Sequence, residues 1–242
     1  MPADSSRILK EVTAVTLALV KYPPGEISRN GFQRIGIRVP GVRAVLKQGY
    51  PFLAESAATV INLWDYIWKN AEYYEVAHQA IYYYQHKTLL REEFKKIKQW
   101  IMRCDCWEHS DDLSKIYAQV VEDNPEWILP TLEKWNRARS PWKRRQSVVA
   151  LIEYASKRRR VLPFSRLIQF VTPLLDDDDY YVQKGVGWTL REIYNVYPAE
   201  TLRYIETNLL SLGANAYSAA TEKIDKQTKS RLNEIRREHR SR

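Results

Sequence analysis

The second half of the chain repeats its hydrophobic pattern with a fixed period, and this period most constrains the fold. The segment that begins at Arg145 (RQSVVAL) superimposes on the segment that begins at Lys184 (KGVGWTL), 39 residues later. A unit of this length suits two antiparallel helices, as in HEAT-type solenoids. Residues 167–171 and 202–205, which follow the two segments, both have the apolar pattern of the next helix of a pair. We therefore expect stacked helix pairs with a concave side that can hold a long ligand.

Other features also indicate an all-α protein. The chain has eight glycines, no long alternating strand pattern, and long stretches with helical spacing. We expect an earlier helix pair, rich in Trp and Tyr, between Trp64 and Tyr84. Prolines between the helical segments predict helix starts and stops. These are Pro23, Pro24, Pro40, Pro51, Pro125, Pro130, Pro141, Pro163, Pro173 and Pro198.

Basic residues are in excess and unevenly distributed. The net charge of +9 favours an anionic partner. Nine Lys or Arg lie between Arg137 and Arg160, against one acidic residue, Glu153. We expect a single HEAT-like domain over residues 1–222, a solenoid with a concave basic groove, and a frayed or disordered basic tail over residues 223–242. The acidic run at residues 176–179 is expected to cap the helix that follows it.

The sequence lacks the signals of several other protein classes. No secretory signal pattern and no run of about 18 apolar residues is present, so we expect a cytoplasmic protein without a membrane partner. Cys104 and Cys106 are too close for an ordinary structural disulfide and are expected to be reduced thiols. With His109 they could in principle bind zinc, but no fourth ligand is evident, and we expect no metal and no cofactor.

Trp188 is predicted to lie on the side of its helix that faces away from the core. At about 100° per residue, it clusters with Lys184 and Arg191 almost opposite the apolar stripe. That stripe consists of Val182, Val186, Leu190 and Ile193. An indole between two cations is typical of a surface that contacts the backbone and sugars of nucleic acid. The alternative is an indole buried against a neighbouring helix.

A second Trp lies off the expected core, beside a carboxylate. The apolar stripe of its segment consists of Leu113, Ile116, Tyr117 and Val120. Trp107 and Asp111, four residues apart, share the far side if the helix already begins before Trp107. The alternative is that Ser110 or Asp111 is only an N-cap and that Trp107 packs in the preceding turn.

These motifs together resemble the AlkD family of DNA alkylpurine glycosylases. The resemblance runs from about Gly36 to Ile205 and is most specific over residues 183–192 (QKGVGWTLRE). It also includes the Trp107 and Asp111 pair, Trp135, the W-K-R-R motif at residues 142–145, and the element GIRVPGVR at residues 36–43. The sequence departs from the family at Gly185, where Ala is common.

The resemblance implies a HEAT-like solenoid that holds duplex DNA and excises cationic alkylated purines, such as 3-methyladenine and 7-methylguanine, without flipping the base. In that family the carboxylate matching Asp111 is catalytic, and the indoles matching Trp107 and Trp188 flank the deoxyribose of the damaged nucleotide. The Arg matching Arg145 supports the DNA backbone near the lesion. We expect the other DNA contacts from Arg43, Trp142, Lys143, Arg144, Lys184 and Arg191.

The expected chemistry follows from these residue types. A purine alkylated on a ring nitrogen is positively charged and leaves without a general acid, while positive charge develops on the sugar, as in glycoside hydrolysis. The carboxylate of Asp111 would stabilise that charge and could orient the attacking water, and the faces of the two indoles would add cation–π attraction. Neutral lesions are expected to be poor substrates.

Two other functions remain open, because a fold alone does not establish an activity. One is a noncatalytic protein that binds damaged or branched DNA, in which Asp111 is only a cap. The other is a HEAT-like scaffold for an acidic protein, which leaves the two off-core Trp residues unexplained. We expect a monomer that acts on duplex DNA.

Overall fold

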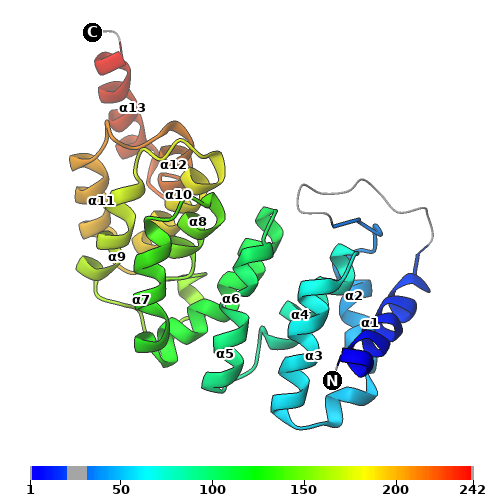
Figure 1. Cartoon of the computed structure of the whole chain (residues 1–242). Coiled ribbons are helices and arrows are strands. Elements are labelled where there is room, and N and C mark those ends of the chain that lie inside the picture. The colour runs from blue at the N-terminus through cyan, green and yellow to red at the C-terminus, as the bar shows by residue number, and fades with distance from the viewer. Residues whose placement is uncertain (1, 21–31, 241–242) are drawn as a thin grey trace. The chain divides into compact units, whose positions relative to one another are not determined.

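The computed structural model describes residues 2–20 and 32–240 of the chain. These residues form thirteen α-helices and four short 3-10 helices, and they contain no strand, only an isolated parallel bridge between Gln33 and Tyr73. The predicted all-α fold is therefore confirmed (Figure 1). The chain divides into two compact units, Met1–Ile116 and Tyr117–Arg242, and the boundary falls within one helix, α6 (Trp107–Asp123).

The first unit is built around an aromatic core. Before α6 it contains α1 (Pro2–Leu17), α2 (Val39–Gln48), η1 (Pro51–Ala54), α3 (Ala57–Asn70), α4 (Tyr74–Tyr84), α5 (Arg91–Ile97) and η2 (Trp100–Arg103). Helices α3 and α4 pack together, as the expected Trp- and Tyr-rich pair. The buried rings of Trp68 and Trp100 stack at 5.7 Å, and the indole N–H of Trp100 donates to Asp65 Oδ1 at 3.0 Å. Such bonds allow large aromatic side chains to be buried without unpaired polar atoms.

The second unit consists of stacked helix pairs. After α6 it contains α7 (Pro125–Asn136), α8 (Pro141–Val149), η3 (Ala155–Lys157), α9 (Phe164–Val171), η4 (Thr172–Leu174), α10 (Tyr180–Tyr194), α11 (Pro198–Thr207), α12 (Ala214–Ala220) and α13 (Lys226–Arg240). Helix α10 packs against α8 and also against α12 (Figure 1). The repeated segments of the sequence lie on α8 and α10, and the helices that follow them are α9 and α11. The helix pairs predicted from the 39-residue period are thus present.

Turn and cap residues explain most of the helix boundaries. Prolines occupy the first turns of α2, η1, α7, α8 and α11, as predicted. Asp179 caps α10, because its carboxylate accepts from the N–H groups of Tyr181 and Val182. The prediction for Pro130 is wrong, since this residue lies inside α7. Its side chain is exposed, so water can satisfy the backbone carbonyl that loses its partner. Pro23 and Pro24 lie outside the described residues.

The basic end of the chain is helical where it is described. Helix α13 covers Lys226–Arg240, and its Leu232 is buried. Arg236 donates to the carbonyl oxygen of Leu212 at 2.9 Å, which attaches α13 to the rest of the second unit. A frayed or disordered tail is therefore the wrong description of residues 226–240, because the helix has an apolar contact of its own. None of the described helices has the length and apolar character needed to cross a membrane.

Candidate nucleic-acid interface

The first part of α6 carries Trp107 and Asp111 outside its buried stripe. The helix begins at Trp107, so the two side chains lie one turn apart on one side of it. Trp107 is 49% exposed and Asp111 is half-buried, whereas Leu113 is buried. The alternative in which Ser110 caps a later helix is wrong, because Ser110 lies inside α6 and is buried.

The neighbouring carboxylate, Asp112, is an internal anchor. Its Oδ2 lies 2.6 Å from His78 Nε2, its Oδ1 accepts from Gln85 Nε2 at 2.8 Å, and it also pairs with Lys115. Burial acts to raise the pKa of Asp112, but the hydrogen bonds and charges of His78 and Lys115 together hold it well below its usual range. Asp112 therefore stays ionised and ties α6 to α4.

Arg43 belongs to the same network in the first unit. Its guanidinium donates to Gln85 Oε1 at 2.9 Å and lies 4.3 Å over the ring of Tyr82. Because Gln85 also binds Asp112, the chain of contacts runs from α2 through α4 to α6. These contacts leave Arg43 half-buried.

The histidine of the C-x-C-x-x-H pattern lies in the aromatic core. His109 stacks on Tyr74 with the ring centroids 4.6 Å apart, and its Nδ1 lies 3.0 Å from Asp105 Oδ1. Burial lowers the pKa of His109 to about 4, so the ring is neutral near pH 7. One ligand atom each of Asp105, Cys106 and His109 lies within 4.8 Å of the others, and Cys104 and Cys106 form no disulfide. Asp105 and His109 lie within hydrogen-bond distance of each other. That no metal binds here stays a prediction.

In the second unit, α10 carries Trp188 beside its buried stripe. Trp188 is half-buried, and its indole N–H donates to Glu192 Oε1 at 3.3 Å. Lys184 is exposed, and Arg191 is half-buried and paired with Glu222 at 2.6 Å. The indole is thus only partly buried, and its N–H group is held by the buried carboxylate of Glu192, one turn along the helix.

Helix α8 supports α10 through two arginines that the sequence placed at the DNA. Arg145 is only 4% exposed, donates to the carbonyl oxygen of Tyr181 at 2.7 Å, and has its guanidinium 6.0 Å from the centre of the Trp188 ring. Arg144 forms a bidentate pair with Asp177 at 2.6 and 3.0 Å. These guanidinium groups therefore hold α10 and the loop before it in position.

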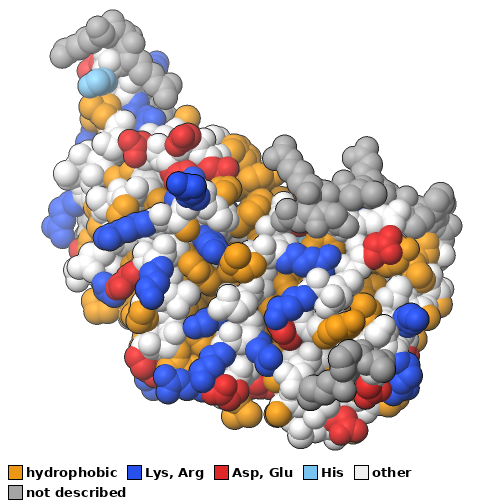
Figure 2. All heavy atoms as spheres, viewed as in Figure 1, with side chains coloured by type: hydrophobic (Ala, Val, Ile, Leu, Met, Phe, Trp, Pro, Cys, Tyr) orange, Lys and Arg blue, Asp and Glu red, His pale blue; other side chains and the backbone are white. Residues whose placement is uncertain are grey.

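The other two predicted residues of α8 are more accessible. Trp142 and Lys143 are both half-buried, and the ring of Trp142 lies 5.0 Å from that of Tyr181. Figure 2 shows Lys and Arg side chains over the face of the second unit, with hydrophobic side chains between them. This mixture of cations and apolar rings is suited to a nucleic-acid backbone.

Sequence reasoning missed Tyr154, in the loop that follows α8. Its ring lies 5.4 Å from that of Trp188, and it is the one non-glycine residue with a positive φ, 45°, among residues 2–20 and 32–240. The segment around Tyr154 has no helical period, so a pattern of apolar residues at helical spacing does not identify it. Its one signal was an aromatic residue in the middle of a basic run.

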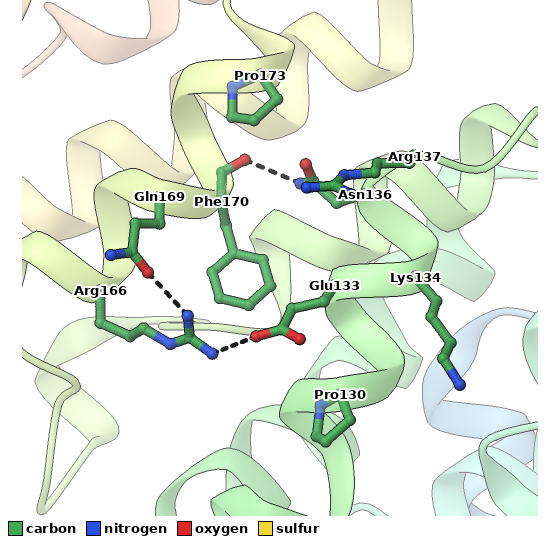
Figure 3. A pocket seen from close by; sticks show the side chains of 9 residues that line it. All are labelled: Pro130, Glu133, Lys134, Asn136, Arg137, Arg166, Gln169, Phe170 and Pro173. Carbon is green, nitrogen blue, oxygen red and sulfur yellow. Dashed lines mark hydrogen bonds and ion pairs between the residues drawn. The ribbon is translucent and has the colours of Figure 1, made fainter.

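The second unit also contains a cleft that none of these residues lines. It is formed by α7, α9 and the turn after each of them, and Phe170 forms part of its wall (Figure 3). Arg166 bridges it by pairing with Glu133 and donating to Gln169 Oε1 at 2.8 Å. No residue predicted for the site lines this cleft. An interface with duplex DNA is a surface rather than an enclosed pocket, so the cleft is not a candidate for it.

The predicted site residues fall into two groups. The first unit brings together Trp107 and Asp111, with Arg43 joined to their helix through Gln85 and Asp112. The second unit brings together Trp188 and Arg145, with Lys184 and Arg191 on the helix of Trp188. The meeting of the two groups on one nucleotide stays a prediction.

Solved structures from Enterococcus faecalis and Streptococcus mutans have a similar fold. A predicted DNA alkylation repair enzyme from Enterococcus faecalis has a TM-score of 0.65 and 18% identity, with 89% of this chain and 96% of that one covered. AlkD2 from Streptococcus mutans has a TM-score of 0.59 and 16% identity over 90% of this chain and 99% of that one. The protein smu.31 from Streptococcus mutans UA159 has a TM-score of 0.57 and 17% identity, covering 76% and 91%.

These likenesses show a shared helical-repeat fold. No curated protein matches the chain significantly. The family model described as DNA alkylation repair enzyme matches residues 18–224, which is most of the chain. The chain therefore belongs to the DNA alkylation repair enzyme family, as its motifs predicted.

Proposed function

We propose that this protein is a monofunctional DNA glycosylase that excises cationic alkylated purines, of the 3-methyladenine and 7-methylguanine type, from duplex DNA. One observation carries the proposal: α6 holds Trp107 and Asp111 together outside its buried stripe. The adjacent Asp112 is bound internally by His78 and Lys115, so that the two consecutive carboxylates have different roles. We expect this arrangement where one carboxylate, Asp111, takes part in the reaction and the next, Asp112, holds the helix in position.

The proposed reaction is hydrolysis of the N-glycosidic bond. The bond between C1′ and the purine nitrogen breaks, and its electron pair neutralises the charge of the alkylated base. A water oxygen forms the new bond to C1′, and its proton passes by way of the Asp111 carboxylate to solvent. Asp111 stabilises the positive charge that develops on the sugar, and the faces of Trp107 and Trp188 add cation–π attraction. No cofactor takes part in these steps, and the base stays stacked in the duplex.

The proposed DNA interface uses both units of a monomer. We assign it to the concave basic groove that the sequence predicts, and the net charge of +9 supports attraction to a polyanion. Lys184 is the exposed cation beside Trp188 and is assigned to a phosphate. The buried Arg145 is assigned to the support of Trp188, and Arg144 to the support of the loop before α10. Arg43, Trp142, Lys143 and Arg191 complete the interface.

The test is release of methylated base from alkylated duplex DNA by wild type and Asp111→Asn under single-turnover conditions. Loss of one preorganised charge-stabilising group lowers a catalytic rate by about 100-fold or more, and we expect at least that loss. Glu126→Gln is the matched control, because Glu126 is exposed on α7 and its removal changes the net charge by the same amount. The control should stay within about twofold of wild type, since it leaves α6 intact.

The outcome also separates the main alternative. If wild type binds the alkylated duplex but releases no base, the protein is a noncatalytic binder of damaged DNA. If Asp111→Asn releases base as fast as wild type, Asp111 is not the catalytic carboxylate.

A further inference from the structure

The loop after α8 presents a strained aromatic residue at the surface. Tyr154 has φ 45° and ψ 88°, a left-handed conformation that costs a residue with a side chain about 1–3 kcal/mol. The residue is 39% exposed, so the buried part of its ring offsets some of this cost while the rest of the ring is open to solvent. Glycine or asparagine would adopt this backbone with less strain. The protein thus carries a bulky aromatic side chain at a position where the backbone favours a smaller residue.

One buried carboxylate holds the strained loop and Trp188 together. Glu192 is 5% exposed, and its Oε1 accepts from the indole N–H of Trp188 at 3.3 Å. Its Oε2 accepts from the backbone N–H of Ala155, the residue after Tyr154, at 3.0 Å. Glu192 thereby fixes the loop and the indole relative to each other. The two rings lie edge to face, at 5.4 Å and 63°.

Cations flank this pair of rings. Lys157 is exposed, and its Nζ lies 4.3 Å from the centre of the Tyr154 ring. The guanidinium of the buried Arg145 lies 6.0 Å from the centre of the Trp188 ring and supports it from the side of α8. Charged phosphates alternate with sugars along a DNA strand. An exposed ammonium can pair with a phosphate, and an aromatic ring beside it can pack on the adjoining sugar. Tyr154 and Lys157 thus supply an exposed aromatic ring and an exposed cation next to Trp188, the composition of a nucleotide site that adjoins the one at Trp188.

We propose that Tyr154 and Lys157 bind the nucleotide next to the one held at Trp188. The ring of Tyr154 packs on its deoxyribose, and the ammonium of Lys157 pairs with its phosphate. This proposal rests on the proposed function in one respect, namely that Trp188 contacts DNA. It does not require that the protein releases a base. Glu192 is a positioning residue for both rings.

Binding of a duplex that contains a tetrahydrofuran abasic-site analogue tests the proposal independently of base release. Tyr154→Leu should raise the Kd about tenfold, in line with the loss of one aromatic contact to a nucleotide. Tyr154→Phe keeps the ring and should stay within about twofold of wild type. Tyr204→Leu is the matched control, because it removes a tyrosine of α11 that contacts Phe164 and Thr172. It should leave the Kd unchanged.

Two further variants separate a DNA contact from a purely structural role. Tyr154→Gly relieves the backbone strain, and it should bind DNA as weakly as Tyr154→Leu while its melting temperature stays the same or rises. Lys157→Ala should lower the slope of log Kd against log salt by about one, and Lys134→Ala on α7 should not. Wild-type Kd values for Tyr154→Leu and Tyr154→Gly would overturn the proposal. Weaker binding by these variants from a wild type that releases no base would support it while refuting the glycosylase function.

Discussion

An arginine near a nucleic-acid interface can meet a phosphate, or it can hold another side chain in place, and the arginines of α8 do the second. Arg145 is buried between α8 and α10, where it binds a backbone carbonyl and lies beside Trp188. Gly185, which departs from the related pattern, packs closely against this side chain. A Cβ at Gly185 would lie 3.0 Å from the Cγ of Arg145, so the arginine would have to shift by a few tenths of an ångström. Lys184 remains the cation of α10 that solvent reaches.

Lys184→Ala and Arg145→Ala each remove one positive charge. The first should change DNA binding, and the second should change stability. Lys184→Ala should weaken binding to duplex DNA and lower its salt slope by about one, because a phosphate contact is lost. Arg145→Ala should leave that slope nearly unchanged and lower the free energy of unfolding by about 1–3 kcal/mol, because the Tyr181 carbonyl loses a buried partner. Kd values over a range of salt, with urea unfolding of each variant, check both effects. Equal slopes for Lys184→Ala and wild type would remove Lys184 from the interface.

For single residues, the sequence predicted on which side of a helix a side chain lies. It did not predict which other residues that side chain binds. The 3.6-residue period places Trp107 and Asp111 together because both belong to α6. It does not distinguish Asp111 from Asp112, because the partner that binds Asp112 is His78, on a different helix. A helical projection also does not show where the charged end of an arginine lies, because the long side chain can fold back onto its own unit. Arg144 does this when it pairs with Asp177.

At the scale of the elements, α10 is the central helix of the second unit. It packs against α8 through Gly185 and against α12 through Gly187, where a Cβ would lie 2.4 Å from the carbonyl oxygen of Ala216. The sequence predicted the buried stripe of α10, its acidic cap and its place in the repeat. It did not predict the close approach of α12, because the glycine alone does not identify the backbone that it meets. Pro130 was misassigned for a related reason, since a proline tolerated on an exposed side looks the same in sequence as one that ends a helix.

The two glycines of α10 should respond differently to the addition of one methyl group. Alanine favours a helix interior over glycine by about 1 kcal/mol, which acts in the same direction at both positions. Gly187→Ala should nevertheless lower the free energy of unfolding by about 2 kcal/mol or more, because its methyl group meets the backbone of α12. Gly185→Ala should change it by less than about 1 kcal/mol, because its neighbours are side chains that can move. Chemical unfolding of both variants tests this, and equal effects would mean that α10 and α12 are not closely packed.

At the scale of the whole molecule, the proposed glycosylase reaction needs residues from both units at one nucleotide. The proposed catalytic carboxylate, Asp111, and one indole come from α6 in the first unit, and the second indole comes from α10 in the second. The helical repeat of the second unit could be predicted because its period is regular. The first unit could be predicted only as helix pairs, because its core depends on aromatic contacts such as Trp68 with Trp100, which have no sequence period.

The central claim, that one acid and two indoles form a single site, is tested most directly by a double-mutant cycle of base release. Single-turnover rates would be measured on one methylated duplex for wild type, Asp111→Asn, Trp188→Leu and the double variant. We expect both single variants to be slower than wild type and the double variant to be within about threefold of Asp111→Asn, because groups that act as a unit are not additive. A double variant slowed by the product of the two single effects, or a Trp188→Leu rate equal to that of wild type, would contradict it.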